Sequence, residues 1–356
     1  MRALRRSSSS SSSLRGTAAG LALLVLLEGC AGAWPHVNDI GVVKSIFLET
    51  DVDRILAIRE HGPDKEIVVL GLRAAAIFDA DTLDVVRRVR YADVSLGSNP
   101  EVIDLEHGHL GIILGGGGYN IVGIREFDGP LLWKFAPEGV QSYRMVGADL
   151  SADGVPELYV ASSAGLFRLD PEGDIVWHQP GLVREVVPLP EGDDGRRLLL
   201  AARSTDRAWD FRDGDGNLVR TVRPDRLVYG PTLVNWENEI GLISRSGQYV
   251  YLHGLDGSMR WRQRVPFTVF GHDAQAIVIE DESPLVAILA HSRLATFRRG
   301  VAASALIIVD TRGVAVYQER LPLARSIYWS NRREALLVGL HDGTILEYAF
   351  PRGGGP

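Results

Sequence analysis

Three carboxylates gather within nine residues near the middle of the chain, at Asp149, Asp153 and Glu157. Like charges that converge on one loop repel one another unless a cation or solvent compensates them. This is a physical motive for a divalent cation, and Ca²⁺ is a hard ion that takes six to eight oxygen ligands. The alternative is a metal-free hairpin, in which Asp153 and Gly154 satisfy the turn geometry.

Other segments that resemble chemical motifs lack the residues that the chemistry needs. The glycine run Gly115 to Gly118 has no following Lys-Ser or Lys-Thr, so it does not read as a phosphate-binding loop. We expect it to let the backbone turn or approach a neighbour closely. No Gly-x-Ser-x-Gly elbow occurs, and the lone Cys30 cannot serve as a nucleophile once it is acylated or removed. We therefore predict no catalytic residues.

The first thirty residues have the layout of an export signal. Four arginines precede an apolar run from Ala18 to Leu27, which is too short for a permanent transmembrane helix. The stretch Leu27-Glu28-Gly29-Cys30 resembles a bacterial lipobox, which implies lipidation of Cys30. Ala31 after the cysteine then implies sorting to the outer membrane. The alternative is a small-x-small cleavage site at Ala31 to Ala33, which would release a soluble periplasmic or secreted protein.

The charge of the chain argues against nucleic acid as a partner. Lys and Arg total 38 against 45 Asp and Glu, for a net charge of −7, and an acidic chain is repelled by a polyanion. Hydrophobic residues make up 46% of the sequence, enough to bury a large core. Short aliphatic and β-branched runs, separated by turn residues, predict an almost entirely β protein.

A repeat organises these short runs. An apolar residue, an Asp, a turn containing Gly and then a long side chain recur, with the Asp at positions 79, 128, 170, 213, 256 and 310; the copies at 79 and 213 are degenerate. The spacing is near 43 residues, which indicates the blades of a β-propeller. The long side chains after the turn are expected to fill the gaps between neighbouring blades. The aromatic ones are Trp133, Trp177, Trp261 and Tyr317.

The repeats predict seven four-stranded blades, with eight as the alternative because one interval is long. The last repeat lacks its outer strand, and Asp39 to Ser45 has the right character to supply it and close the ring. The expected organisation is a signal peptide at 1–29, an anchor and short linker at 30–38, one propeller at 39–350 and a flexible tail at 351–356.

Two families share these patterns. The Asp, Gly, Trp turn resembles the quinoprotein-type repeat, which occurs in quinone-dependent alcohol dehydrogenases and in BamB, the lipoprotein subunit of the outer-membrane β-barrel assembly machine. The segment from Gly147 to Leu158 is similar to an FG-GAP (VCBS) repeat. That resemblance implies one Ca²⁺ site, with ligands from Asp149, Ser151, Asp153, the Val155 carbonyl and Glu157.

The functional prediction is a protein-binding scaffold at the cell envelope, anchored to the membrane by its N-terminal lipid and bound to an unidentified envelope protein. Propellers present broad loop faces, and nothing in this sequence assembles a catalytic constellation. The alternatives are a ligand- or carbohydrate-binding sensor and a quinone-cofactor oxidoreductase. The chain lacks the adjacent cysteine pair of many such enzymes, so no pyrroloquinoline quinone is expected.

Overall fold

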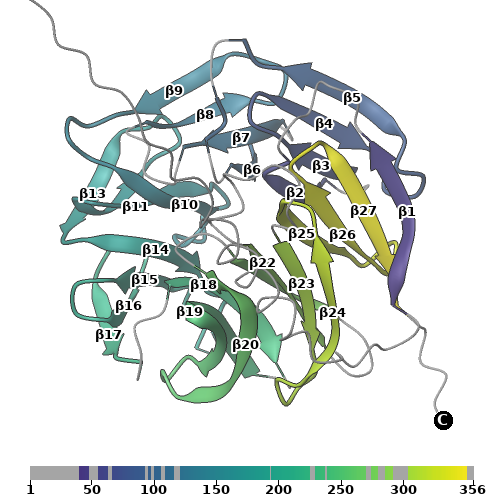
Figure 1. Cartoon of the computed structure of the whole chain (residues 1–356). Helices are drawn as coiled ribbons and strands as arrows, with labels where there is room; N and C mark the ends of the chain where they lie inside the picture. Colours follow the sequence, from purple (N-terminus) through teal and green to yellow (C-terminus); the bar gives the residue numbers. More distant parts are fainter. Residues whose placement is uncertain are drawn as a thin grey trace, which may run out of the picture.

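The computed structural model describes residues 40–47, 55–62, 66–92, 95–97, 100–105, 109–115, 121–192, 194–224, 229–236, 239–269, 274–279, 285–291 and 304–350. Within these ranges the chain forms strands and turns only, arranged as seven antiparallel blades around a ring (Figure 1). No helix in the described part of the chain is long and apolar enough to cross a membrane. The all-β propeller expected from the sequence is confirmed.

The first four blades each contain four strands in chain order, from the centre of the ring to its rim. Blade 1 comprises β2 (Ala57–His61), β3 (Glu66–Leu70), β4 (Ala74–Phe78) and β5 (Val85–Arg90). Blade 2 comprises β6 (Glu101–Asp104), β7 (Leu110–Leu114), β8 (Val122–Glu126) and β9 (Leu131–Phe135). Blade 3 comprises β10 (Ser142–Ala148), β11 (Glu157–Ser162), β12 (Gly165–Leu169) and β13 (Ile175–Pro180). Blade 4 comprises β14 (Val183–Pro188), β15 (Leu199–Arg203), β16 (Ala208–Arg212) and β17 (Leu218–Val222).

Blade 5 comprises β18 (Tyr229–Trp236), β19 (Glu239–Gly254) and β20 (Met259–Val269). The long β19 folds back on itself, because the hydroxyl of Ser244 lies 3.0 Å from Nδ1 of His253, whereas residues nine apart in one straight strand are about 30 Å apart. This blade therefore also has four strand segments. Blade 6 comprises β21 (Ala274–Ile279), β22 (Leu285–His291), β23 (Ser304–Val309) and β24 (Ala315–Leu321).

The last blade closes the ring with a strand from the other end of the chain. Blade 7 comprises β25 (Ala324–Ser330), β26 (Ala335–Leu340) and β27 (Thr344–Ala349), with β1 (Gly41–Phe47) as its outer strand. β1 pairs antiparallel with β27, from Gly41 opposite Ala349 to Phe47 opposite Thr344. The predicted closure is confirmed, two residues further along the chain than the sequence indicated. The ring holds seven blades, so the alternative of eight is wrong.

The core of the molecule lies between the blades. In the described residues, seven clusters of buried apolar side chains each draw on two neighbouring blades. The middle strands β23 and β26 are buried along their whole length, because both of their faces contact another blade. That is why they read as continuous apolar runs rather than alternating ones. The innermost strands of successive blades contact one another around the centre.

The glycine run and the long repeat interval can both be located on the fold. Gly115 donates its N–H to the carbonyl of Leu96 at 3.1 Å, and a Cβ on Gly97 would lie 2.4 Å from the Gly115 carbonyl oxygen. The glycine run thus begins at a close approach of two backbones, and its other members lie outside the described residues. The long interval before the sixth turn falls between β22 and β23, at residues 292–303, which also lie outside them.

Candidate functional site

The acidic hairpin at residues 149–157 connects β10 to β11, the two innermost strands of blade 3. The carboxylate of Asp149 accepts the N–H groups of Asp153 at 3.2 Å and Gly154 at 3.1 Å, and Ser151 Oγ lies 3.4 Å from its Oδ1. Asp153 accepts the N–H of Val155 at 2.8 Å. Gly154 has a φ of +85°, which the absence of a Cβ permits. The side chains therefore close the turn through backbone hydrogen bonds.

A guanidinium group from the next blade compensates the charge of Asp149. Nη1 of Arg197, from the loop between β14 and β15 of blade 4, lies 3.0 Å from Oδ2 of Asp149 and 2.9 Å from its carbonyl oxygen. Desolvation raises the pKa of the Asp149 carboxyl, but the Gly154 amide and the Arg197 guanidinium lower it more, so the net shift is downward. Asp149 is held as a carboxylate that joins two blades.

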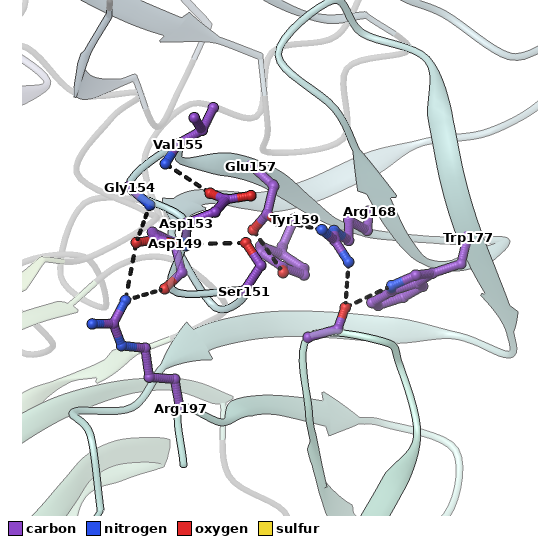
Figure 2. A network of polar contacts seen from close by, with 11 residues as sticks. Asp149, Ser151, Asp153, Gly154, Val155, Glu157, Tyr159, Arg168, Trp177 and Arg197 are labelled. Atoms are coloured by element: carbon purple, nitrogen blue, oxygen red, sulfur yellow. Dashed lines mark hydrogen bonds and ion pairs between the residues drawn. The ribbon is translucent and has the colours of Figure 1, made fainter. Parts of the chain in front are cut away.

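Glu157 reaches into the seam between blades 3 and 4, where it contacts Arg168 and Tyr159 (Figure 2). It is buried, at 4% exposure, and its carboxylate forms an ion pair with Arg168 of β12. The hydroxyl of Tyr159 donates to its other oxygen at 3.1 Å. Burial, followed by the nearby negative charge of Glu157, raises the pKa of Tyr159, which keeps that hydroxyl protonated as a donor.

Arg168 also contacts blade 4. Its Nη1 donates to the carbonyl oxygen of Gly214 at 2.7 Å, and the indole N–H of Trp177 donates to the same oxygen at 3.0 Å (Figure 2). Gly214 lies in the turn between β16 and β17. Glu157, Arg168 and Trp177 thus form one polar tie between two blades, which we call the blade 3–4 tie.

The donor set expected for Ca²⁺ does not converge in this arrangement. Asp149 contacts Arg197 and Glu157 contacts Arg168, so two of the three carboxylates already have a cationic partner. The third, Asp153, accepts the N–H of Val155. Among the described residues, no group of three or more His, Cys, Asp or Glu side chains is placed to hold a metal ion. As arranged, these residues do not fit a Ca²⁺ site, and calcium binding at Asp149, Ser151, Asp153, Val155 and Glu157 stays a prediction for direct measurement.

The aromatic residues that follow the repeated turn lie between blades. A Cβ on Gly173 would lie 2.6 Å from the ring of Trp133, and one on Gly313 would lie 2.7 Å from the ring of Trp261. In each case the glycine belongs to the corresponding turn of the next blade, and only a residue without a side chain leaves room for the indole. The indole N–H of Trp133 also donates to the Pro171 carbonyl at 2.7 Å.

Tyr317 occupies the same repeat position in blade 6. Its ring meets the ring of Tyr348 of blade 7 edge to face, with centroids 6.4 Å apart. Its hydroxyl donates to Glu319 at 2.7 Å, and the hydroxyl of Tyr348 donates to the same carboxylate oxygen at 2.9 Å.

The predicted lipidation site, Cys30, lies outside the described residues.

A second polar tie, which the sequence did not reveal, joins the innermost strands of three blades. Glu101 at the start of β6 lies 3.2 Å from Arg59 of blade 1 and 2.9 Å from Arg144 of blade 3. Desolvation raises the pKa of Glu101, but the two guanidinium charges lower it more, so the net shift is downward. The three residues are 42 and 43 positions apart. That spacing, one repeat period, was the signal that could have paired them.

No family model matches the chain, and no curated protein matches it in sequence. Solved structures do match, and they carry the same fold. Two crystal structures of BBS1N in complex with ARL6DN, soaked with mercury and with lead, superpose with a TM-score of 0.61 at 13% identity. They cover 89% and 88% of this chain, and 98% of their own chains are covered. BamB from Moraxella catarrhalis matches with a TM-score of 0.51 at 16% identity, over 87% of this chain and 100% of its own. Identities this low establish the propeller fold and nothing more specific.

Proposed function

We propose that this chain is a non-catalytic, exported β-propeller that binds protein partners at the cell envelope. A lipid on Cys30 would hold it at the outer membrane, after removal of the signal peptide at 1–29. The observation that carries the non-catalytic part is the use of the acidic hairpin in blade 3. Two of its three carboxylates, those of Glu157 and Asp149, are bound by Arg168 and Arg197 and tie blades together, instead of facing a substrate.

Two likenesses support the binding part of the proposal. BBS1N, a propeller of similar shape, crystallised in complex with the protein ARL6DN, which is an example of this fold engaging another protein. The sequence also resembles the quinoprotein-type repeat of BamB, and the BamB structure shares the fold. Polar side chains that bind one another between blades hold the propeller rigid, so its surfaces are preformed. A preformed surface loses less entropy on binding.

The proposed lipid anchor is tested at the N-terminus of the mature protein. Mass spectrometry of the protein purified from membranes should show a diacylglyceryl group on Cys30. A mature chain that begins at Trp34 would contradict the anchor and leave a soluble exported protein.

The binding function is tested by affinity capture from native membranes with the lipid anchor intact. One envelope protein should be enriched in proportion to the bait, and a Cys30→Ser chain, which cannot be acylated, should enrich less of it. Binding is then measured with the purified pair. Failure of the wild-type chain to enrich any partner, together with turnover of a quinone dye or retention on a glycan array, would favour the enzyme or sensor class instead.

A further inference from the structure

The rim of the propeller is basic where blade 1 meets blade 7. β5, the outermost strand of blade 1, has the sequence Val-Val-Arg-Arg-Val-Arg, with three exposed arginines and no acidic residue. The N–H of Tyr91 donates to the carbonyl of Arg73 at 2.7 Å, which places a fourth exposed arginine beside the end of this strand. On β1 of blade 7, Lys44 is also exposed, and its Nζ donates to the Thr82 carbonyl of blade 1 at 2.8 Å.

The alternation of the strand directs two of these arginines toward blade 7. Arg87 pairs with Asp128 of blade 2, so its side chain points to that neighbour. Arg88 and Arg90 lie on the opposite face of β5, because successive side chains of a strand alternate between faces. That face is on the side of β1, which packs with β5 on one apolar cluster and lies next to it on the rim (Figure 1). These cations form one stretch of the rim, which we call the rim patch: Lys44, Arg73, Arg88 and Arg90.

Acidic groups of the described residues leave the rim patch positive. Asp81, in the turn before β5, forms an ion pair with Arg332. Asp84 is exposed at the start of β5, about 13 Å along the strand from Arg88. Exposed charges that far apart are largely screened, because the Debye length in physiological salt is about 8 Å. The same screening keeps the net charge of the whole chain, −7, from cancelling the local charge of the patch.

A second rim strand carries as many arginines, but all of them contact other side chains. β20 of blade 5 has three arginines. The first pairs with Glu239, the second lies over the ring of Tyr249, and the third donates to Gln248. In the described part of the chain, the side chain of Arg88 has no such contact. β20 is also two blades away from β1, whereas β5 is next to it.

The proposed lipid on Cys30 holds this side of the molecule near the membrane. Cys30 is ten residues before Ile40, the first residue that the structure describes, and ten extended residues span at most about 35 Å. The chain then enters β1 at Gly41. Of the two rim strands that flank β1, β5 carries cations only, whereas β24 has one Glu and one Arg. On the tethered side, the strand that attracts anions is therefore β5.

We propose that the rim patch docks the propeller edge-on against an anionic lipid surface. This inference rests on the lipid anchor of the proposed function and names the side of the molecule that faces the membrane. The acyl group supplies the anchor and the patch orients the ring, because each Lys or Arg near an anionic surface strengthens binding about fivefold. With its rim against the membrane, the propeller leaves both loop faces open to a protein partner.

The test measures co-sedimentation of the mature chain with vesicles, with Cys30→Ser so that no acyl group contributes. Vesicles of equal parts phosphatidylcholine and phosphatidylglycerol should bind it, less so in high salt, and pure phosphatidylcholine vesicles should not. Arg88→Gln with Arg90→Gln should weaken binding about 25-fold. The matched control, Arg262→Gln with Arg264→Gln on β20, removes two arginines at the same spacing and should bind like the wild type. If the double variant loses stability, Arg88→Gln alone should still weaken binding about fivefold.

A fluorescent probe locates the contact. Cys30 is the only cysteine of the chain, so the Cys30→Ser chain can take a single new one. A polarity-sensitive dye on Val86→Cys, in β5, should shift to the blue when vesicles bind. The same dye on Leu218→Cys, at the start of β17 in blade 4, should not. The two parent side chains are similarly exposed, at 59% and 52%.

Three results would each overturn the proposal: no vesicle binding by the wild type, equal binding by Arg88→Gln with Arg90→Gln, or a blue shift at Leu218→Cys alone. So would a concentration-dependent dimer in place of vesicle binding. Acidic residues at positions 49, 51 and 53 lie outside the described residues, and neutralisation of the patch by them would appear as the first of these results. If the rim fails while mass spectrometry shows an acylated Cys30, the anchor stands. A mature chain that begins at Trp34 would instead remove the anchor itself.

Discussion

The seam between blades 3 and 4 and the seam between blades 1 and 2 use the same repeat position with different chemistry. In the first, Trp177 packs its ring over Gly216 and donates to the Gly214 carbonyl. In the second, Arg87 takes the place of the indole and pairs with Asp128 of the next turn. The position requires a side chain long enough to reach the next blade. An apolar ring and a charge both meet that requirement, but they should differ in energy and in salt dependence.

Removal of the closing strand should have the largest effect. Deletion of Trp34 to Lys44 removes the first four residues of β1 and leaves only Ser45 to Phe47 to pair with β27. Lost ladder hydrogen bonds and the lost burial of Ile40 should lower the free energy of unfolding by about 5 kcal/mol. Denaturant unfolding measures this, with deletion of 31–38 as the control. Equal stability of both deletions would contradict closure through β1.

Truncation of a seam tryptophan should come next. Trp177→Ala removes a large packed ring and the bond to the Gly214 carbonyl, and large-to-small changes of this kind cost about 3 to 4 kcal/mol. The loss should be nearly independent of salt, because most of it is packing. A strong salt dependence in chemical denaturation by urea would show that the seam is chiefly electrostatic.

The tie at the centre of the ring should make stability depend on pH. Because the pKa of Glu101 lies below its ordinary value of 4.5, its contribution is fully present above that value and is lost as the pH falls through the folded-state pKa. We expect about 1 to 2 kcal/mol at neutral pH. Wild type and Glu101→Gln, compared by unfolding from pH 7 down to pH 3, should converge at the acid end. A gap that stays constant would exclude the ion pairs as its source.

The ion pair at the seam of blades 1 and 2 should contribute least. Arg87 is half exposed, and exposed pairs contribute less than about 1 kcal/mol. Arg87→Ala should therefore lower stability slightly, and the difference from wild type should shrink further in high salt. Arg87→Trp tests the equivalence of the two seams, since an indole at this position should at least restore the lost stability. A stability loss in Arg87→Ala as large as that in Trp177→Ala would show that the two seams do not differ in energy.

The sequence predicted the ring because its information is local and repeated. Each turn with Gly at a positive φ, as at Gly173 and Gly313, selects the same hairpin, and the indole of the preceding blade needs that glycine for space. The half-built last blade likewise predicted the closing strand. The partners of the acidic hairpin were not predictable in this way. Arg197 is 48 residues from Asp149, which places it in the next blade but not in a particular loop. The spacing of Glu157 likewise does not reveal its ion pair with Arg168 of β12.

The central claim is that Asp149 and Glu157 of the acidic hairpin join blades 3 and 4 through Arg197 and Arg168. Calorimetry of wild type and Glu157→Gln, each in chelator and in millimolar Ca²⁺, tests it most directly. Breaking the buried pair with Arg168 should cost about 3 kcal/mol, equally with and without Ca²⁺, and the wild-type melting curves should superimpose. A wild type that Ca²⁺ stabilises, by about 2.7 kcal/mol for a site at a hundred times its dissociation constant, with no such gain in Glu157→Gln, would contradict the claim.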